Sequence, residues 1–215
     1  MHRHLRKLFL SHAEDDSLNR FLDAVKFPSL EELSYKMEYD ITKKSFIPLL
    51  KRSGNRLKRL TLLMGNDSKE TSDSLIELLL DTVPYLQILQ CEFLWEGSFF
   101  LYTMIDLFKA LSWAPPTLPG GIPGFLYELQ SLVIYSHITT TIWGRIPHIF
   151  NWSHRKLLTL NFETKRSVYI HDELDEILQL IKKGFDIRIF ESGQDYLQKI
   201  YTQEPSLADP DESDI

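Results

Sequence analysis

The chain of 215 residues is short of the features that mark secreted and membrane proteins. It has a single cysteine, Cys91, so no internal disulfide can form, and this fits a reducing compartment. No apolar run approaches the roughly 20 residues that a membrane-spanning helix needs. The basic N-terminal segment carries an apolar run that is too short for a secretory signal. We therefore expect a cytoplasmic or nuclear protein with no membrane partner.

A basic excess is also absent. Lys and Arg total 24 against 30 Asp and Glu, which gives a formal net charge of −6. Nucleic-acid-binding domains usually gather a basic excess on one face, whereas the basic residues of this chain are mostly scattered. The composition therefore predicts no nucleic-acid partner.

Recognisable catalytic motifs are missing as well. The chain has no Gly-x-Ser-x-Gly, no phosphate-binding Walker loop and no dinucleotide-binding glycine pattern. His148 and His154 flank Trp152 without a regular metal-ligand spacing. We predict no catalytic residue, no metal and no cofactor, so the chain is not expected to be an enzyme. A hydrolase that uses scattered Ser, His and Asp residues is the alternative from another class.

What the chain has instead is a repeated apolar triplet, Leu-x-x-Leu-x-Leu with apolar substitutes. Its copies start at positions 5, 30, 57, 86, 129, 157 and 184, which lie 25, 27, 29, 43, 28 and 27 residues apart. All but one of these spacings fall within the range of about 20–29 residues known for leucine-rich repeats. The long spacing contains the Pro/Gly-rich segment at about 112–125, which predicts an insertion. The triplets are Leu5, Leu8 and Leu10; Leu30, Leu33 and Tyr35; Leu57, Leu60 and Leu62; Leu86, Leu89 and Cys91; Leu129, Leu132 and Ile134; Leu157, Leu160 and Phe162; and Gly184, Ile187 and Ile189.

Between the triplets, apolar residues recur every three or four positions, which is typical of a helix with one face on a core. A strand and a helix in each unit predict an α/β fold: a leucine-rich-repeat solenoid with a curved parallel sheet and helices on its convex side. We assign this domain to residues 1–200 and expect the acidic tail, 204–215, to be disordered. The apolar stripes include Leu18, Phe21, Leu22 and Val25; Phe46, Ile47, Leu49 and Leu50; Met104, Ile105, Leu107, Phe108 and Leu111; Ile142, Ile146, Ile149 and Phe150; and Leu174, Ile177, Leu178 and Ile181.

Several segments resemble the leucine-rich-repeat region of fungal F-box proteins, especially those of mushroom-forming fungi. The most specific is the helix that ends in Arg52-Ser53 and is followed by the triplet from Leu57. The resemblance implies the substrate-binding part of a Skp–cullin–F-box ubiquitin ligase adaptor. The chain shows no recognisable F-box and starts close to a repeat strand, so we expect a fragment, a truncated gene prediction or a degenerate paralogue. We expect a ligase core subunit to bind only if an F-box lies upstream. The segments are FPSLEELSY at 27–35, FIPLLKRSGNRLKRLTL at 46–62, VPYLQILQC at 83–91, SHRKLLTLNF at 153–162 and LIKKGFDIRI at 180–189.

The alternation of side chains along a strand predicts the binding surface. Because the triplet leucines point inward, the residues between and before them must line the concave side. We expect this face to recognise a protein substrate; a free-standing leucine-rich-repeat scaffold or inhibitor is the alternative to the ligase adaptor. A possible second patch comprises Trp95, Phe99 and Trp113. The concave-face residues are Lys7, Phe9, Glu32, Ser34, Arg59, Thr61, Ile88, Gln90, Ser131, Val133, Thr159, Asn161, Asp186 and Arg188.

Overall fold

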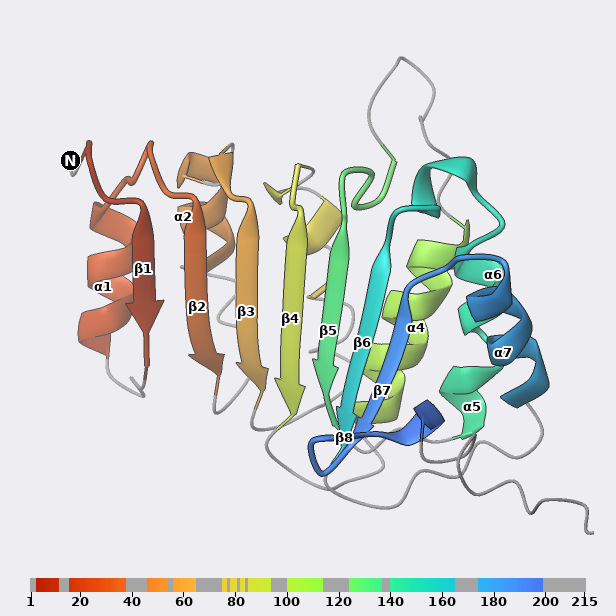
Figure 1. Ribbon diagram of the computed structural model, residues 1–215. Coiled ribbons are helices and arrows are strands. Elements are labelled where there is room, and N and C mark those ends of the chain that lie inside the picture. The colour runs from red at the N-terminus through yellow and green to blue at the C-terminus, as the bar shows by residue number, and fades with distance from the viewer. Residues whose placement is uncertain are drawn as a thin grey trace, which may run out of the picture.

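The fold is α/β, with one eight-stranded sheet in which the strands lie in chain order (Figure 1). The computed structural model describes residues 3–11, 16–37, 46–53, 56–64, 75–76, 78–80, 82–83, 85–93, 100–113, 124–136, 140–164 and 174–198. The tail at 204–215 and most of the Pro/Gly-rich segment lie outside these residues. The strands are β1 (Lys7–Leu10), β2 (Glu32–Met37), β3 (Arg59–Met64), β4 (Ile88–Phe93), β5 (Ser131–Tyr135), β6 (Thr159–Thr164), β7 (Ile187–Glu191) and β8 (Gln194–Asp195).

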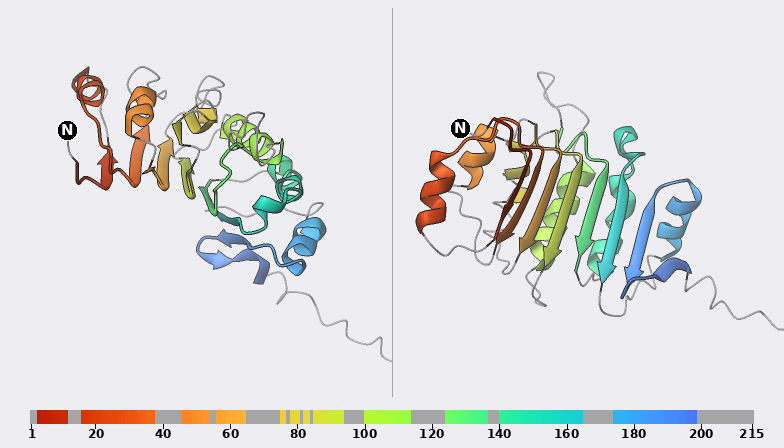
Figure 2. Two further views of the ribbon diagram at one scale, coloured as in Figure 1. Left: turned by 90° about the horizontal axis from the view of Figure 1, so that it is seen from above. Right: turned by 60° about the vertical axis from the view of Figure 1, so that its left-hand side comes forward.

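The helices all lie on one side of the sheet. Seen from above, the sheet curves and the helices occupy its outer, convex side, and no described helix lies on its inner side (Figure 2). The helices are α1 (Asp16–Ala24), α2 (Phe46–Ser53), α4 (Phe100–Trp113), α5 (Thr140–Trp143), α6 (Ile146–Ile149) and α7 (Leu174–Lys182), with a short 3-10 helix η2 (Ser153–Arg155).

The first seven strands pair in parallel, and their register aligns the predicted triplets. Leu33 pairs with Leu60, Leu60 with Leu89, and the same row continues through Leu132 and Leu160 to Ile187. The prediction of parallel strands in chain order is therefore confirmed for β1–β7. The short β8 was not predicted; it pairs antiparallel with β7 through a turn in which Ser192 and Gly193 have positive φ values.

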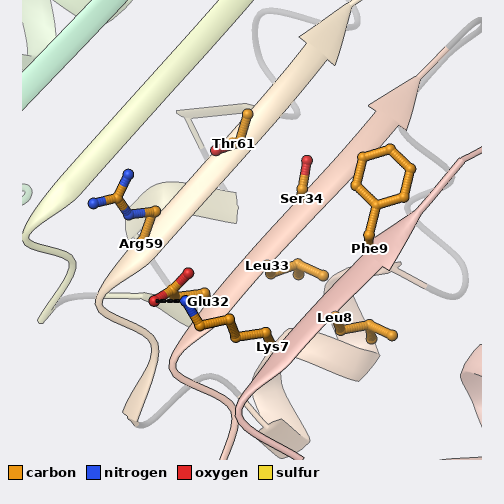
Figure 3. A pocket seen from close by; sticks show the side chains of 8 residues that line it. All are labelled: Lys7, Leu8, Phe9, Glu32, Leu33, Ser34, Arg59 and Thr61. Atoms are coloured by element: carbon orange, nitrogen blue, oxygen red, sulfur yellow. Dashed lines mark ion pairs between the residues drawn. The ribbon is translucent and has the colours of Figure 1, made fainter.

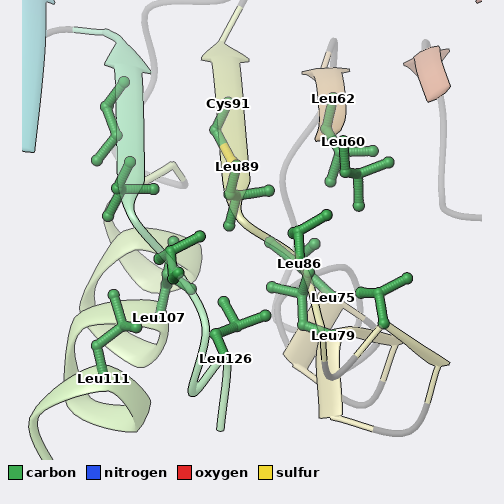
Figure 4. Close-up of a cluster of buried hydrophobic side chains, with 14 of the residues drawn as sticks. Leu60, Leu62, Leu75, Leu79, Leu86, Leu89, Cys91, Leu107, Leu111 and Leu126 are labelled. Carbon is green, nitrogen blue, oxygen red and sulfur yellow. The ribbon is translucent and has the colours of Figure 1, made fainter. Parts of the chain in front are cut away.

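The triplet side chains form the core between the sheet and the helices. Leu33, Leu60, Leu89, Leu132 and Leu160 are all at most 1% exposed, as predicted. Figure 4 shows Leu60 and Leu89 pointing away from the open side of the sheet, in the same cluster as helix residues such as Leu107. Cys91 is fully buried at its triplet position, and this burial raises the pKa of its thiol to about 12.

Two apolar positions were predicted wrongly. Phe21 of α1 was expected on the buried stripe and is 43% exposed, while its neighbour Leu22 is fully buried. Leu157 was expected to point inward and is 87% exposed, whereas Leu158 is 1% exposed.

A shortened turn explains the displacement at Leu157. In earlier units the amide of the first triplet leucine donates to the carbonyl three residues before it, as Leu86 does to Val83. Here the amide of Leu158 makes that hydrogen bond, to the carbonyl of Arg155 at 3.0 Å. Leu158 lies two residues before Leu160, whereas Leu86 lies three residues before Leu89. The link between the turn and strand β6 is therefore one residue shorter, and Leu157 points outward.

Helix α7 ends at a glycine. Gly184 has a φ of +91°, which a glycine adopts without steric cost. Its amide donates to the carbonyl of Ile181, and the amide of Phe185 donates to that of Leu180. These two bonds satisfy carbonyls that the helix end leaves free, in the pattern of a Schellman motif.

The ends of the Pro/Gly-rich segment are pinned to the stretch around η2. The indole Nε1 of Trp152 donates to the carbonyl of Ser112 at 2.8 Å. The fully buried guanidinium of Arg155 donates to the carbonyls of Leu126 and Phe125 at 2.6 and 2.5 Å. Leu126 has a φ of +45°, a conformation that non-glycine residues seldom adopt. Arg155 therefore stabilises a turn whose backbone geometry is unfavourable on its own.

Candidate functional site

The predicted binding residues alternate along the strands with the buried triplet residues, so they belong to the side of the sheet that faces away from the helices. We call this side of the sheet, which is the inner side in Figure 2, the open face. The strand register arranges the fourteen predicted residues in two adjacent rows that cross the sheet. The first row is Lys7, Glu32, Arg59, Ile88, Ser131 and Thr159, followed by Asp186 just before β7; the second is Phe9, Ser34, Thr61, Gln90, Val133, Asn161 and Arg188.

An open groove of about 280 Å³ lies at the β1–β3 end of the open face (Figure 3). Six of the predicted residues line it, together with Leu8 and Leu33. Lys7 and Glu32 form an ion pair across it, with 2.9 Å between Nζ and Oε1. Phe9 is 63% exposed, and Arg59 makes no ion pair with a described residue. The groove thus offers an aromatic ring and a guanidinium to a partner. Its lining is Lys7, Leu8, Phe9, Glu32, Leu33, Ser34, Arg59 and Thr61.

The middle of the open face carries no charge in the predicted rows. Strands β4–β6 present side chains that are half-buried and either apolar or capable of hydrogen bonding. One of them, Asn161, has a buried Oδ1 without a hydrogen-bond partner among the described residues. These central residues are Ile88, Gln90, Ser131, Val133, Thr159 and Asn161.

At the β7 end, the predicted charges neutralise each other. Arg188 donates from Nε to Oδ1 of Asp186 at 2.8 Å and from Nη2 to Oδ2 at 3.0 Å. Thr159 Oγ1 adds a hydrogen bond to the same carboxylate at 3.0 Å. The hydrogen bond from Arg188, together with that from Thr159, lowers the pKa of Asp186 below its ordinary value. Asp186 and Arg188 therefore form an ion pair at this end of the open face.

A third row on the open face was missed by the sequence analysis. It lies two residues beyond the second row, because the strands continue further than the motif does. Extending the alternation by two more residues along each strand would have found it. The row comprises Lys36, Leu63, Glu92, Tyr135, Glu163 and Phe190.

The predicted second patch is only partly described. Trp113 ends α4 and is 79% exposed, on the helical side of the molecule. Trp95 and Phe99 lie outside the described residues. The patch as predicted is therefore not assembled by the described part of the chain.

The remaining candidate groups for chemistry lie apart from the open face. His154 stacks on Tyr127 with 5.1 Å between ring centroids, and neither of its ring nitrogens hydrogen-bonds to a described residue. Burial, helped by the charge of Arg155, lowers the pKa of His154 to about 4. Within the described ranges, no group of three or more His, Cys, Asp or Glu side chains could hold a metal ion. Among the same residues, no helix has the length and apolar character needed to cross a bilayer.

Comparisons of the chain with protein-family models, with curated proteins and with solved structures returned no match.

Proposed function

We propose that the chain is a leucine-rich-repeat solenoid whose open face recognises another protein. The observation that carries this proposal is the inner side of seven parallel strands, which no described helix covers (Figure 2) and which presents three aligned rows of mixed side chains. Protein-binding surfaces combine apolar, aromatic and hydrogen-bonding groups in this way. Arginine and aromatic side chains are the types that most often dominate binding energy, and the groove at β1–β3 presents Arg59 and Phe9.

The backbone contacts between units support the solenoid. At the four junctions from β1 to β5, one carbonyl accepts two consecutive amides of the following unit, whereas at β5–β6 the carbonyl of Gln130 accepts from the single amide of Thr159. The carbonyl of Glu31 accepts from Lys58 and Arg59 at 2.8 and 3.0 Å, and the carbonyl of Lys58 accepts from Gln87 and Ile88 at 2.9 and 2.8 Å. A unit that cannot bury its apolar face alone gains a continuous core by stacking in this manner.

The segment that carries the most specific part of the fungal F-box resemblance also joins two units. The buried hydroxyl of Ser53 accepts from the amide of Phe27 at 3.0 Å. Arg52 donates from Nη2 to the carbonyl of Leu22 at 2.6 Å. On the strength of the resemblance, we propose that the partner is a substrate of an F-box-like ubiquitin ligase adaptor. A free-standing scaffold or inhibitor is the second candidate, since the open face does not depend on a ligase.

Affinity capture from the native cell separates these two candidates. The tagged chain, expressed from its own locus, is expected to bring down ligase-core subunits if it serves as an adaptor. Capture of other proteins without any core subunit would favour the scaffold or inhibitor.

Substitutions on the open face test recognition itself. The double variant Arg59→Glu and Gln90→Trp should abolish partner capture and leave the thermal unfolding midpoint unchanged, because both side chains point away from the core. The matched control is Lys182→Glu with Gln179→Trp on α7, where both side chains lie on the helical side. Unchanged capture by the open-face variant would move the binding site to the aromatic segment around Trp95 and Trp113.

A further inference from the structure

A tyrosine lies between two glutamates in the third row of the open face. Tyr135 of β5 pairs with Glu92 of β4 on one side and with Glu163 of β6 on the other. Neighbouring strands lie about 4.8 Å apart, so the two glutamates are about 10 Å apart across the ring. All three side chains are half-buried. Burial raises the pKa of Tyr135 above its ordinary value, and the charges of Glu163 and Glu92 raise it further.

These two carboxylates differ from the other acids of the open face. Glu32 is paired with Lys7, and Asp186 is paired with Arg188. Glu92 and Glu163 make no ion pair and no side-chain hydrogen bond with a described residue. The centre of the face therefore carries two uncompensated negative charges next to its uncharged rows. Half-buried charges without a partner are unfavourable, and an opposite charge from a binding partner would relieve this cost.

We propose that Glu92, Tyr135 and Glu163 form a subsite for an arginine or lysine side chain of the bound protein segment. This inference rests on the proposed recognition by the open face and names the chemistry of the partner. A cation above the tyrosine ring gains a cation–π interaction when it lies within about 6 Å of the ring centre. The same cation can donate to a carboxylate on each side, and guanidinium suits this because its five N–H groups point in several directions.

The row on either side of the subsite indicates what surrounds the cation. Leu63 of β3 pairs with Glu92, and Phe190 of β7 pairs with Glu163. A basic residue flanked by apolar residues fits this order of side chains. The partner is therefore a protein segment with an arginine or lysine between apolar side chains.

Peptide selection on the intact chain tests the subsite even while the natural partner is unidentified. A phage-displayed library of random linear peptides is selected on the immobilised full chain, and selected peptides are measured by fluorescence anisotropy. Arg and Lys should be enriched over the unselected library. The double variant Glu92→Gln and Glu163→Gln should weaken binding by about tenfold or more, since hydrogen bonds to charged groups contribute about 1.5–3 kcal/mol, equivalent to a factor of at least ten.

Three further variants complete the design. The control Glu128→Gln with Glu176→Gln removes two exposed carboxylates elsewhere, and it should change affinity by less than about twofold if net charge is not the cause. Tyr135→Phe keeps the aromatic face and should retain binding, whereas Tyr135→Leu should lose it. Thermal unfolding of each variant checks that the chain stays folded.

The outcomes distinguish this inference from the proposed function. Selected peptides that bind Arg59→Glu/Gln90→Trp poorly but bind Glu92→Gln/Glu163→Gln as well as the wild type would overturn the cation subsite and leave recognition by the open face standing. Peptides without Arg or Lys enrichment would overturn the subsite in the same way. Selection of no peptide, or of peptides insensitive to every open-face variant, would overturn both.

Discussion

The repeat motif and the structure disagree on which of the adjacent leucines, Leu157 or Leu158, is buried in the core. The motif points Leu157 into the core; the structure leaves it 87% exposed and buries Leu158 to 1% exposure. Leu158→Ala removes three buried carbons, which at about 0.8 kcal/mol each amounts to roughly 2.4 kcal/mol of transfer free energy. The cavity that remains raises the total loss to about 2–5 kcal/mol. Leu157→Ala removes atoms already in water and should change the free energy of unfolding by less than about 0.5 kcal/mol.

Urea unfolding followed by circular dichroism measures both variants. With a slope of about 1–3 kcal/mol per M, Leu158→Ala should lower the unfolding midpoint by about 1 M or more, and Leu157→Ala should leave it in place. A large loss for Leu157→Ala with a loss below about 1 kcal/mol for Leu158→Ala would refute the shortened turn and restore the motif register.

Other parts of the structure support four further predictions. Leu60→Ala should cost about 2–5 kcal/mol of unfolding free energy because Leu60 is fully buried between Leu33 and Leu89, and a loss below roughly 1 kcal/mol would mean that it lies elsewhere. Arg155→Ala should cost about 2–4 kcal/mol in the same assay, since it leaves the carbonyls of Phe125 and Leu126 without donors, while the exposed Lys156→Ala should be neutral. The pKa of His154 is about 4 in the folded chain, below its ordinary value, so the unfolded chain binds more protons at pH values between the two. The free energy of unfolding should therefore fall as the pH is lowered through this range. A His154→Phe variant that shows the same fall would contradict this prediction. The isolated chain should self-associate through β1, which pairs only with β2 among the described strands and exposes Phe9; Phe9→Lys should reduce the association in sedimentation velocity, and a monodisperse wild-type monomer at high concentration would argue against the idea.

Strand positions and register were predictable because every unit must point the same residues at one shared core. A slip of one residue would expose Leu60 and bury Arg59, which is energetically costly, so the pattern of apolar residues determines the register. The same reasoning fails where two leucines are adjacent, as at Leu157 and Leu158. There the choice depends on the turn that precedes them, and that turn is built around a buried arginine that no apolar pattern reveals.

The residues of the open face were predictable in part for a related reason. Alternation in a strand gives the direction of a side chain but not its partners. The fourteen predicted residues all belong to the inner side of the sheet. Alternation did not predict, however, that Asp186 and Arg188 form an ion pair in which their charges neutralise each other. Tyr135 and its two glutamates were missed because the motif ends before the strands do.

The carbonyls that accept two amides from the next unit make it possible to add a repeat unit by gene duplication. The junctions from β1 to β5 use equivalent backbone atoms, for example between Glu31 and the amides of Lys58 and Arg59, and then between Lys58 and those of Gln87 and Ile88. An in-frame duplication that starts and ends at equivalent junctions would therefore present the same acceptor to the same donors. The new unit would extend the open face by one strand and add one residue to each of its rows. The length of the open face and the set of side chains that it presents can thus change together in a single genetic event, without a new kind of contact.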